Sequence, residues 1–311
     1  MHGQFSWYDL MTPDSAAAKK FYPSVTGWST EEWDKADYTM WTAGGAPFAG
    51  MNPITPDQTA QGIRPHWLAY VTVDDIGRTA DKVTSLGGRV LHEEEIPDVG
   101  RFAIIQDPQG AMLAVIKSST PSPGWDGTPS LGKFSWHELV TSDYRAAFDF
   151  YRQLFGWENQ QEMDMGPAGK YLMYGKNGKM YGGIYNREPG QSNVPPNWLF
   201  YANVKDVDKA VEAAKKNGGQ VRRPPMEVPG GSRVAVLSDP QGALFAVHQT
   251  KAKAAAAPKA RAKKAQAKKK SSAKPKPRVK TKASAKKKSR PKAKARAKAR
   301  PKKAARKARR R

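Results

Sequence analysis

The 311-residue sequence predicts an α+β protein of two tandem domains followed by a disordered tail. Three observations lead to this prediction. Residues 1–250 contain an internal repeat with an offset of 129 to 133 residues, and each copy alternates strand-like with helix-like segments. After residue 250 the composition changes to Lys, Arg, Ala and Pro, which leaves almost nothing apolar to bury. We expect domain 1 over residues 1–118, a linker over 119–131, domain 2 over 132–250 and the tail over 251–311.

The repeat begins at the first strand and continues to the last one. Phe5–Trp7 recurs as Phe134–Trp136, and Asp107–Ala111 recurs as Asp239–Ala243. Between these landmarks the recurring residues are mostly acidic, aromatic or glycine: Asp9/Glu138, Phe21-Tyr22/Phe150-Tyr151, Gly27-Trp28/Gly156-Trp157 and Gly87-Gly88/Gly218-Gly219. Agreement at this many positions indicates that one domain has been duplicated.

The first half of domain 1 reads as strand, helix and short strands. Phe5–Thr12 alternates like a strand, and the Pro-Asp-Ser cluster after it is typical of a helix start. The helix is predicted from Ala16 to Val25, with Gly27 as its C-terminal cap. Short strands are expected around Tyr38–Thr42 and Pro47–Met51.

The second half repeats this order. A strand over Trp67–Val73 precedes a helix that runs to Leu86, where Gly87-Gly88 ends it. The Asp-Pro-Gln-Gly turn at 107–110 predicts a hairpin before the last strand. The strands expected after this helix are Arg89–Glu93, Arg101–Gln106 and Ala111–Lys117. Each copy is therefore predicted to hold two β-α-β-β-β modules.

Charge separates the repeats from the tail. Of the 53 Lys and Arg residues, 30 lie in 251–311, together with none of the 28 Asp and Glu residues. The first 250 residues thus hold 23 basic and 28 acidic side chains, a net charge of −5. The absence of cysteine excludes disulfides, thiolate nucleophiles and cysteine-bound metals. With no apolar run of membrane-spanning length and no signal peptide at the N-terminus, we expect a cytoplasmic protein.

The arrangement resembles the vicinal oxygen chelate superfamily, which includes glyoxalase I, bleomycin-resistance proteins and extradiol dioxygenases. The resemblance rests on the helix that ends Phe21-Tyr22…Gly27-Trp28, on its copy, and on the Asp-Pro-Gln-Gly hairpin before each last strand. It covers residues 3–250, in the tandem two-domain form of the family. It implies concave mixed sheets and a range of activities that includes isomerases, dioxygenases, transferases and non-catalytic drug binders.

Enzymes of this superfamily place metal ligands on the first and last strands of each module. Transferred onto this sequence, those positions hold only apolar or indole side chains: Trp7/Trp136, Ala49-Gly50/Gly182-Gly183, Leu68/Leu199 and Ala114/Ala246. None of these side chains binds a metal. We therefore expect no cofactor, with a divalent metal conceivable only at a displaced site.

Strand alternation predicts which residues face a ligand, because residues i and i+2 share one face of a strand. Trp7 and Trp136 hold the ligand-facing position of the first strand, so Asp9 and Glu138 share their face. These two acids are the candidate general bases. The other candidate ligand-binding residues are His66, Tyr70, Asn197, Tyr201 and His248.

The tail resembles linker-histone C-terminal tails in composition. A segment with this charge binds phosphate polymers by releasing condensed counterions, and it has no side chains suited to reading bases. The densest cationic positions are Lys268, Lys269, Lys270, Lys286, Lys287, Lys288, Arg309, Arg310 and Arg311. DNA is the expected partner, although RNA, polyphosphate or an anionic membrane surface offers the same chemistry. DNA binding would make the protein nucleoid-associated.

The sequence thus predicts a metal-free protein that binds a small organic ligand in its sheet cavities and is tethered to DNA by its tail. Two alternatives stay open. One is a glyoxalase-, hydroxylase- or dioxygenase-like enzyme, and the other is an architectural nucleic-acid-binding protein whose repeats are only a folded head. Because the two domains can bury their interface within one chain, we expect a monomer or a weak dimer.

Overall fold

A computed structural model of the chain describes residues 1–34, 38–120, 125, 127–188, 190 and 194–251. The tail predicted over 251–311, with all nine of its nominated cationic positions, lies outside the described residues except for Lys251. In the described part of the chain no helix is long and apolar enough to cross a membrane.

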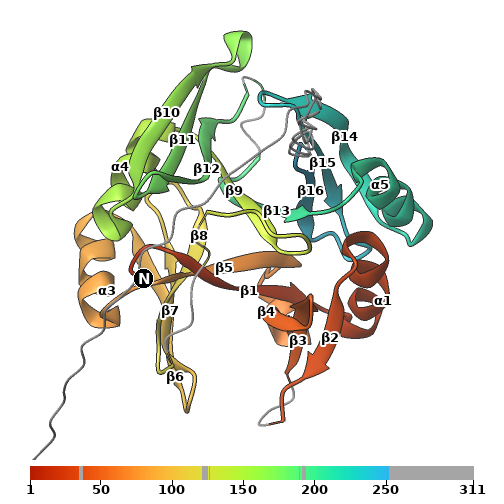
Figure 1. Ribbon diagram of the computed structural model, residues 1–311. Helices are drawn as coiled ribbons and strands as arrows, with labels where there is room; N and C mark the ends of the chain where they lie inside the picture. The colour runs from red at the N-terminus through yellow and green to blue at the C-terminus, as the bar shows by residue number, and fades with distance from the viewer. Residues whose placement is uncertain (35–37, 121–124, 126, 189, 191–193, 252–311) are drawn as a thin grey trace, which may run out of the picture. The chain divides into compact units, whose positions relative to one another are not determined.

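The first repeat forms one mixed eight-stranded sheet (Figure 1). Its order is β2-β3-β4-β1-β5-β8-β7-β6, in which β1 pairs in parallel with β4 and β5 pairs in parallel with β8. The elements are β1 (Phe5–Thr12), α1 (Ser15–Thr26), β2 (Ser29–Glu32), β3 (Thr39–Ala43), β4 (Ala46–Pro53), α2 (Pro56–Ala60), β5 (His66–Thr72), α3 (Ile76–Ser85), β6 (Arg89–Ile96), β7 (Gly100–Gln106) and β8 (Met112–Ser118).

The second repeat forms an equivalent sheet of order β10-β11-β12-β9-β13-β16-β15-β14. The two sheets together confirm the predicted α+β class and the paired β-α-β-β-β modules. The elements are β9 (Phe134–Thr141), α4 (Tyr144–Phe155), β10 (Glu158–Asp164), η1 (Gly166–Ala168), β11 (Lys170–Lys176), β12 (Lys179–Asn186), β13 (Asn197–Asn203), α5 (Val207–Lys216), β14 (Gln220–Val228), β15 (Ser232–Ser238) and β16 (Leu244–Gln249).

The ends of α1 and α4 follow from the capping residues. Asp14 and Asp143 accept hydrogen bonds from backbone N–H groups of the first turn, which have no partner within the helix. Gly27 and Gly156 end the helices with φ of 75° and 67°, a conformation in which a side chain would be strained. The same caps in both copies explain why these short motifs recur.

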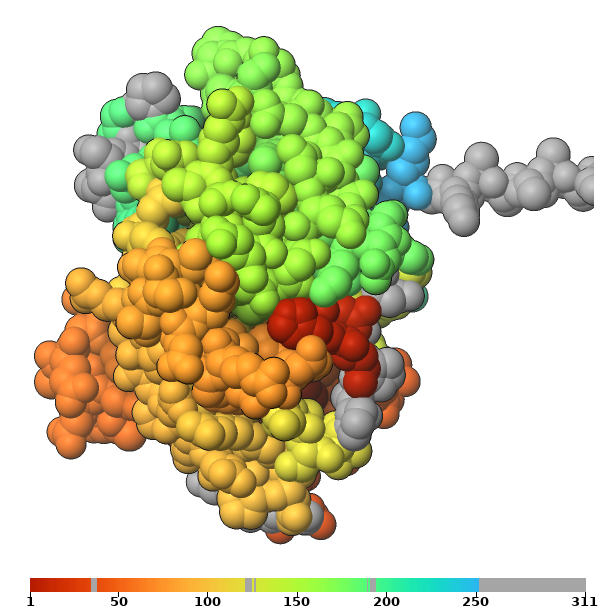
Figure 2. Space-filling model, turned by 90° about the vertical axis from the view of Figure 1, so that its left-hand side faces the viewer, coloured from red at the N-terminus to blue at the C-terminus, as the bar shows by residue number. Residues whose placement is uncertain are grey.

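Most of the buried apolar side chains of both repeats form one continuous core. Helix α1 of repeat 1 packs beside α5 of repeat 2, and α3 of repeat 1 packs beside α4 of repeat 2 (Figure 1). The helices of each repeat are therefore partly covered by those of the other. Figure 2 shows the first repeat, in orange and yellow, directly against the second, in green.

The recurring motifs make hydrogen bonds from one repeat to the other. Tyr22 of α1 donates to Asp239 over 3.1 Å, and its counterpart Tyr151 of α4 donates to Asp107 over 3.0 Å. The second carboxylate oxygen of each aspartate accepts from backbone N–H groups of its own hairpin. These pairs show that the Phe-Tyr and Asp-Pro-Gln-Gly motifs belong to the interface between the repeats.

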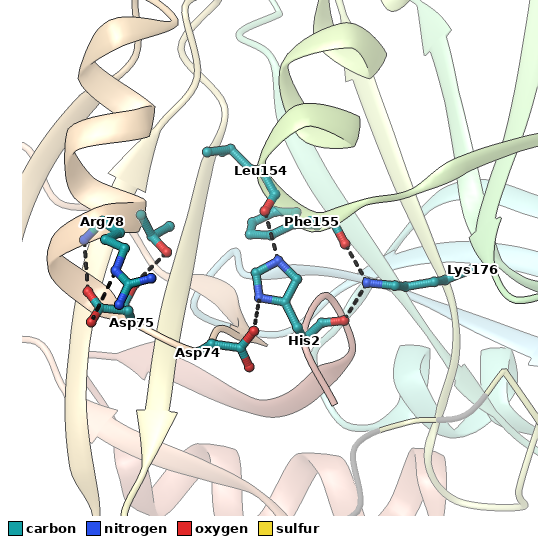
Figure 3. Close-up of polar contacts among 8 residues, drawn as sticks. His2, Asp74, Asp75, Arg78, Leu154, Phe155 and Lys176 are labelled. Carbon is teal, nitrogen blue, oxygen red and sulfur yellow. Dashed lines mark hydrogen bonds and ion pairs between the residues drawn. The ribbon is translucent and has the colours of Figure 1, made fainter.

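The N-terminal residues also join the repeats (Figure 3). The His2 ring is 3.0 Å from the Leu154 carbonyl on one side and 3.4 Å from the Asp74 carboxylate on the other. Lys176 donates to the carbonyls of His2 and Phe155 over 2.7 and 2.8 Å. Partial burial lowers the pKa of Lys176. The first residues of repeat 1 are thus fixed to the end of α4.

Candidate functional site

A hydrogen-bonded carboxylate lies in the centre of the second sheet. Glu138 on β9 accepts from the hydroxyl of Tyr171 on β11 over 2.8 Å and from that of Tyr201 on β13 over 2.9 Å. Trp136, two residues earlier on β9, donates its indole N–H to the Tyr171 oxygen over 2.8 Å. The four side chains form one connected polar group.

Register and a glycine bring these residues together. Tyr201 lies directly opposite Trp136 in the β13–β9 ladder. Gly183 on β12 pairs with Glu138, and a Cβ there would lie 2.0 Å from the Tyr171 ring. Only a residue without a side chain lets the tyrosine cross β12 and reach the carboxylate.

Burial dominates the electrostatics of this group. Loss of solvent raises the pKa of Glu138, while the hydroxyls of Tyr171 and Tyr201 and the charge of Arg223 oppose that rise. Burial and the nearby Glu138 charge raise the pKa of Tyr201 well above its ordinary value, so its hydroxyl stays protonated and donates.

Glu138 lies in the wall of a cavity of about 340 Å³. Tyr201, Tyr185 and Arg223 contribute polar groups to the lining, and His248 faces it from β16. Burial lowers the pKa of His248 to about 4, so its ring is neutral at pH 7, and its Nδ1 is 2.8 Å from the Ser135 hydroxyl. The apolar lining includes four methionines, Met163, Met165, Met173 and Met226. This volume falls in the range of small-molecule sites.

Repeat 1 holds the same polar group in an enclosed form. Asp9 accepts from Tyr38 over 2.6 Å and from Tyr70 over 2.8 Å. Trp7 donates to the Tyr38 oxygen over 2.8 Å, as Trp136 does to Tyr171. Only 5% of Asp9 is exposed, and burial raises its pKa. The two equivalent carboxylates thus differ in exposure, since Asp9 is buried and Glu138 is half-buried in a cavity wall.

The other nominated residues lie at strand ends or beside the cavity. His66 begins β5, and its ring is 2.7 Å from the Arg64 carbonyl. Asn197 begins β13 opposite Val140 and is not part of the cavity lining. Tyrosine hydroxyls donate to both carboxylates: Tyr70 and Tyr201 were predicted from the sequence, whereas Tyr38 and Tyr171 were not. Their offset of 133 residues lies within the range of the repeat and is the signal that would have found them.

The side chains of this site do not fit a divalent metal. Among the described residues, no three or more His, Asp or Glu side chains are close enough together to bind one. Both oxygens of Glu138 already accept tyrosine hydroxyls, and three or four converging ligands are needed for such a site. We therefore derive no reaction step through a metal.

Known proteins resemble the chain throughout both repeats. Over 250 residues it is 34% identical to CFP32 of Mycobacterium bovis, provisionally named a glyoxylase, covering 79% of this chain and 94% of that protein. It is 29% identical over 272 residues to the anthracycline biosynthesis protein DauV of Streptomyces sp. strain C5, covering 82% and 96%.

Solved structures show the same fold at low sequence identity. The Mn(II)-bound glyoxalase of Novosphingobium aromaticivorans superposes with a TM-score of 0.55 and 16% identity over 80% of this chain and 82% of that one. The 2,2',3-trihydroxybiphenyl 1,2-dioxygenase of Sphingomonas wittichii reaches a TM-score of 0.58 with 13% identity over 80% and 91%.

The family model for the Glyoxalase/Bleomycin resistance protein/Dioxygenase superfamily matches the chain twice, over residues 4–115 and 133–247. These matches coincide with the two sheets and with the recurring motifs at their interface. The chain belongs to the Glyoxalase/Bleomycin resistance protein/Dioxygenase superfamily.

Proposed function

We propose that the protein binds a small organic ligand without a metal, in the cavity of the second repeat, and is tethered to DNA by its tail. The observation that carries the binding proposal is the cavity of about 340 Å³ with the tyrosine-bound carboxylate of Glu138 in its wall. Such a cavity buries most of a small ligand, while a few polar groups orient it.

Apolar side chains around these polar groups favour a mostly apolar ligand. Methionine side chains adapt their shape, so this lining suits a flat or irregular molecule. The similarity to a protein named for anthracycline biosynthesis makes compounds of the anthracycline class the first to test.

Ligand binding is tested by tryptophan fluorescence with a panel of such compounds. The chain has nine tryptophans, so the useful quantity is the difference in quenching between the wild-type protein and Trp136→Phe. We expect saturable quenching that is largely lost in the variant. Equal quenching in both proteins for every compound would contradict the proposal that the ligand binds in this cavity. Elemental analysis of the purified protein tests the metal-free part, and a stoichiometric transition metal would contradict it.

The tether is proposed from the charge of the tail, 30 basic residues with no acidic one. Binding by counterion release makes log K fall linearly with log salt, with a slope of about −0.9 for each phosphate neutralised on duplex DNA. We expect a steep salt slope for the full chain and little dependence on base sequence.

The test compares the full chain with a variant that ends at Thr250. DNA, RNA and polyphosphate are offered to both at several salt concentrations. DNA binding that persists in the shortened chain, or that ignores salt, would contradict the tether. Preference for RNA or polyphosphate over DNA would replace the proposed partner.

A second candidate function is catalysis, and the raised pKa of Glu138 favours it. A carboxylate whose pKa is raised by burial accepts a proton from a bound ligand more readily at neutral pH. In this version Glu138 is the general base and the enclosed Asp9 is structural. Mass spectrometry of ligands incubated with the wild-type protein and with Glu138→Gln distinguishes an enzyme from a binder, because only an enzyme changes the ligand.

A further inference from the structure

The two repeats carry the same carboxylate group but cover it differently. In β7–β8 of repeat 1, Phe102 pairs with Ile116, and at the same place in β15–β16 of repeat 2, Val234 pairs with His248. These two pairs therefore occupy equivalent positions in the two sheets.

In repeat 1 the space over the carboxylate group is filled by side chains of the chain itself. Phe102 is 8% exposed and packs edge-on against Tyr70, with ring centres 5.8 Å apart and planes at 65°. Leu68 and Ala114 complete this small cluster, and three isoleucines pack against it: Ile96, Ile104 and Ile116.

In repeat 2 the matching side chains are smaller. Val228, Val234 and Val236 stand where repeat 1 has Ile96, Phe102 and Ile104, as the strand pairings show. All three valines line the cavity, and so does His248, which replaces Ile116. The largest loss of volume is the change from Phe102 to Val234, at the position equivalent to the one that packs against Tyr70 in repeat 1 and therefore beside Tyr201 in repeat 2.

We propose that Phe102 occupies in repeat 1 the space that an aromatic ring of the ligand occupies in repeat 2. The chain then binds one ligand, in the second repeat, with the ring packed edge-on against Tyr201 and a polar substituent facing His248. This inference rests on the proposed binding function and adds the chemical class of the ligand.

The surrounding groups define that class further. The neutral ring of His248 offers a hydrogen bond rather than a positive charge. The lining also holds two carboxylates, Glu138 and Glu188, and two cations, Lys170 and Arg223, so their charges balance and favour neither an anionic nor a cationic ligand. A neutral aromatic compound with one hydroxyl or carbonyl group meets these conditions. Edge-to-face contacts contribute about 0.5–1.5 kcal/mol beyond burial, which corresponds to about a 2- to 12-fold gain in affinity over a saturated ring.

The probes are phenol and cyclohexanol, which have the same number of heavy atoms and one hydroxyl each but differ in the aromaticity of the ring. The full-length protein is labelled at its ten methionine methyl groups and observed by NMR. Met163, Met165, Met173 and Met226 report on the cavity of repeat 2. Met40 reports on repeat 1, because it lies opposite Gly50 as Met173 lies opposite Gly183.

We expect phenol to shift the four cavity methyls at a concentration about 2- to 12-fold lower than cyclohexanol does. Val234→Phe should abolish these shifts, because its ring fills the site as Phe102 does in repeat 1. Phe102→Val should add a phenol-dependent shift at Met40. If that variant does not fold, Val234→Phe decides alone.

Two outcomes overturn the inference. In the first, cyclohexanol shifts the cavity methyls at the same concentration as phenol or a lower one, or Val234→Phe binds phenol unchanged; cavity binding then stands and the aromatic class is wrong. In the second, none of the probes or panel compounds shifts any cavity methyl, and the proposed ligand binding fails with it.

Discussion

Tyr8 and His137 occupy equivalent positions in the two repeats, 129 residues apart, and they bond to each other over 2.5 Å. Equivalent positions can meet only where a twofold axis relates the two copies, so this pair marks the axis. The Tyr181 carbonyl lies 2.9 Å from His137 Nδ1, and a carbonyl can only accept. The Nδ1 atom therefore carries the proton, and Nε2 accepts from the Tyr8 hydroxyl.

The buried imidazole predicts a loss of stability in mild acid. Burial lowers the pKa of His137 to about 3, while in the unfolded chain it has its ordinary value near 6.5. Between these values the unfolded state binds the extra proton. The free energy of unfolding should therefore fall by up to about 1.4 kcal/mol for each pH unit below 6.5, until the folded group titrates near pH 3.

This slope is measured by urea unfolding at several pH values, with His137→Asn as the comparison. In the variant, the pH dependence of the free energy of unfolding should be less steep by the contribution of one proton. The comparison separates His137 from buried carboxylates such as Asp107, whose raised pKa acts in the opposite direction. The same slope in both proteins would contradict the prediction.

The cross-repeat bonds predict a stability cost for removing single hydroxyl groups. Tyr22→Phe removes the hydroxyl that donates to Asp239 Oδ2 and accepts from the Trp67 indole, and Tyr151→Phe is the matching change in the other repeat. Each should lower the free energy of unfolding by about 1–3 kcal/mol, measured by chemical denaturation. Tyr144→Phe is the control, since its hydroxyl accepts from the neighbouring Arg145 at the start of the same helix and makes no bond to the other repeat within the described residues. A control as costly as the test variants would count against the assignment.

Two equivalent glutamines should differ in importance. The carboxamide oxygen of Gln109 accepts from the backbone N–H groups of Ser142 and Asp143 at the start of α4, over 3.1 and 2.6 Å. The matching oxygen of Gln241 is buried without a partner in the described residues, because Pro13 stands where Ser142 does and has no N–H to donate.

Replacing both glutamines by alanine tests this asymmetry. Gln109→Ala should cost about 0.5–1.5 kcal/mol for each of the two N–H groups that lose their acceptor, in the free energy of unfolding. Gln241→Ala should change it by about 0.5 kcal/mol or less. Thermal and urea unfolding give the two values, and equal costs would show that Gln241 has a partner in solution.

Replacing the two equivalent carboxylates, Glu138 and Asp9, should have different effects on ligand affinity. Glu138→Gln places N–H groups against tyrosine hydroxyls that already donate, and it lies in the cavity wall. We expect a loss of affinity for phenol of at least about tenfold, because Tyr201, against which the ligand ring packs, loses a hydrogen bond to a charged group that contributes about 1.5–3 kcal/mol. Asp9→Asn makes the same exchange in the enclosed group and should leave that affinity unchanged within about twofold. Calorimetric titration of both variants supplies the comparison.

Local rules predicted much of the fold. Gly27 and the hairpin at 107–110 fixed where α1 ends and where β8 begins, because turn and cap residues act over a few positions. Strand β2 escaped prediction, since Ser29–Glu32 is exposed along its whole length and does not alternate. The five-residue α2 is too short to produce a helical period.

The candidate site was harder to predict because its contacts are distant in sequence. Alternation along β1 and β9 correctly places Trp7 with Asp9 and Trp136 with Glu138 on one face. The approach of Tyr171 depends on Gly183 in another strand, and no local pattern reveals such a contact. Likewise the repeat shows that Tyr22 and Tyr151 are equivalent, yet only the fold shows that each bonds to the aspartate of the other copy.

The crossed bonds at the interface have a consequence for the history of the chain. Each repeat supplies one tyrosine donor and one aspartate acceptor, so each repeat alone carries both groups that this contact needs. Two identical copies could make the same pair of bonds with each other, as an isologous dimer does. The covalent linker is therefore not required for this pair of bonds, and an ancestral single repeat with the same tyrosine and aspartate had the groups to make them with a second copy before duplication joined two copies in one chain.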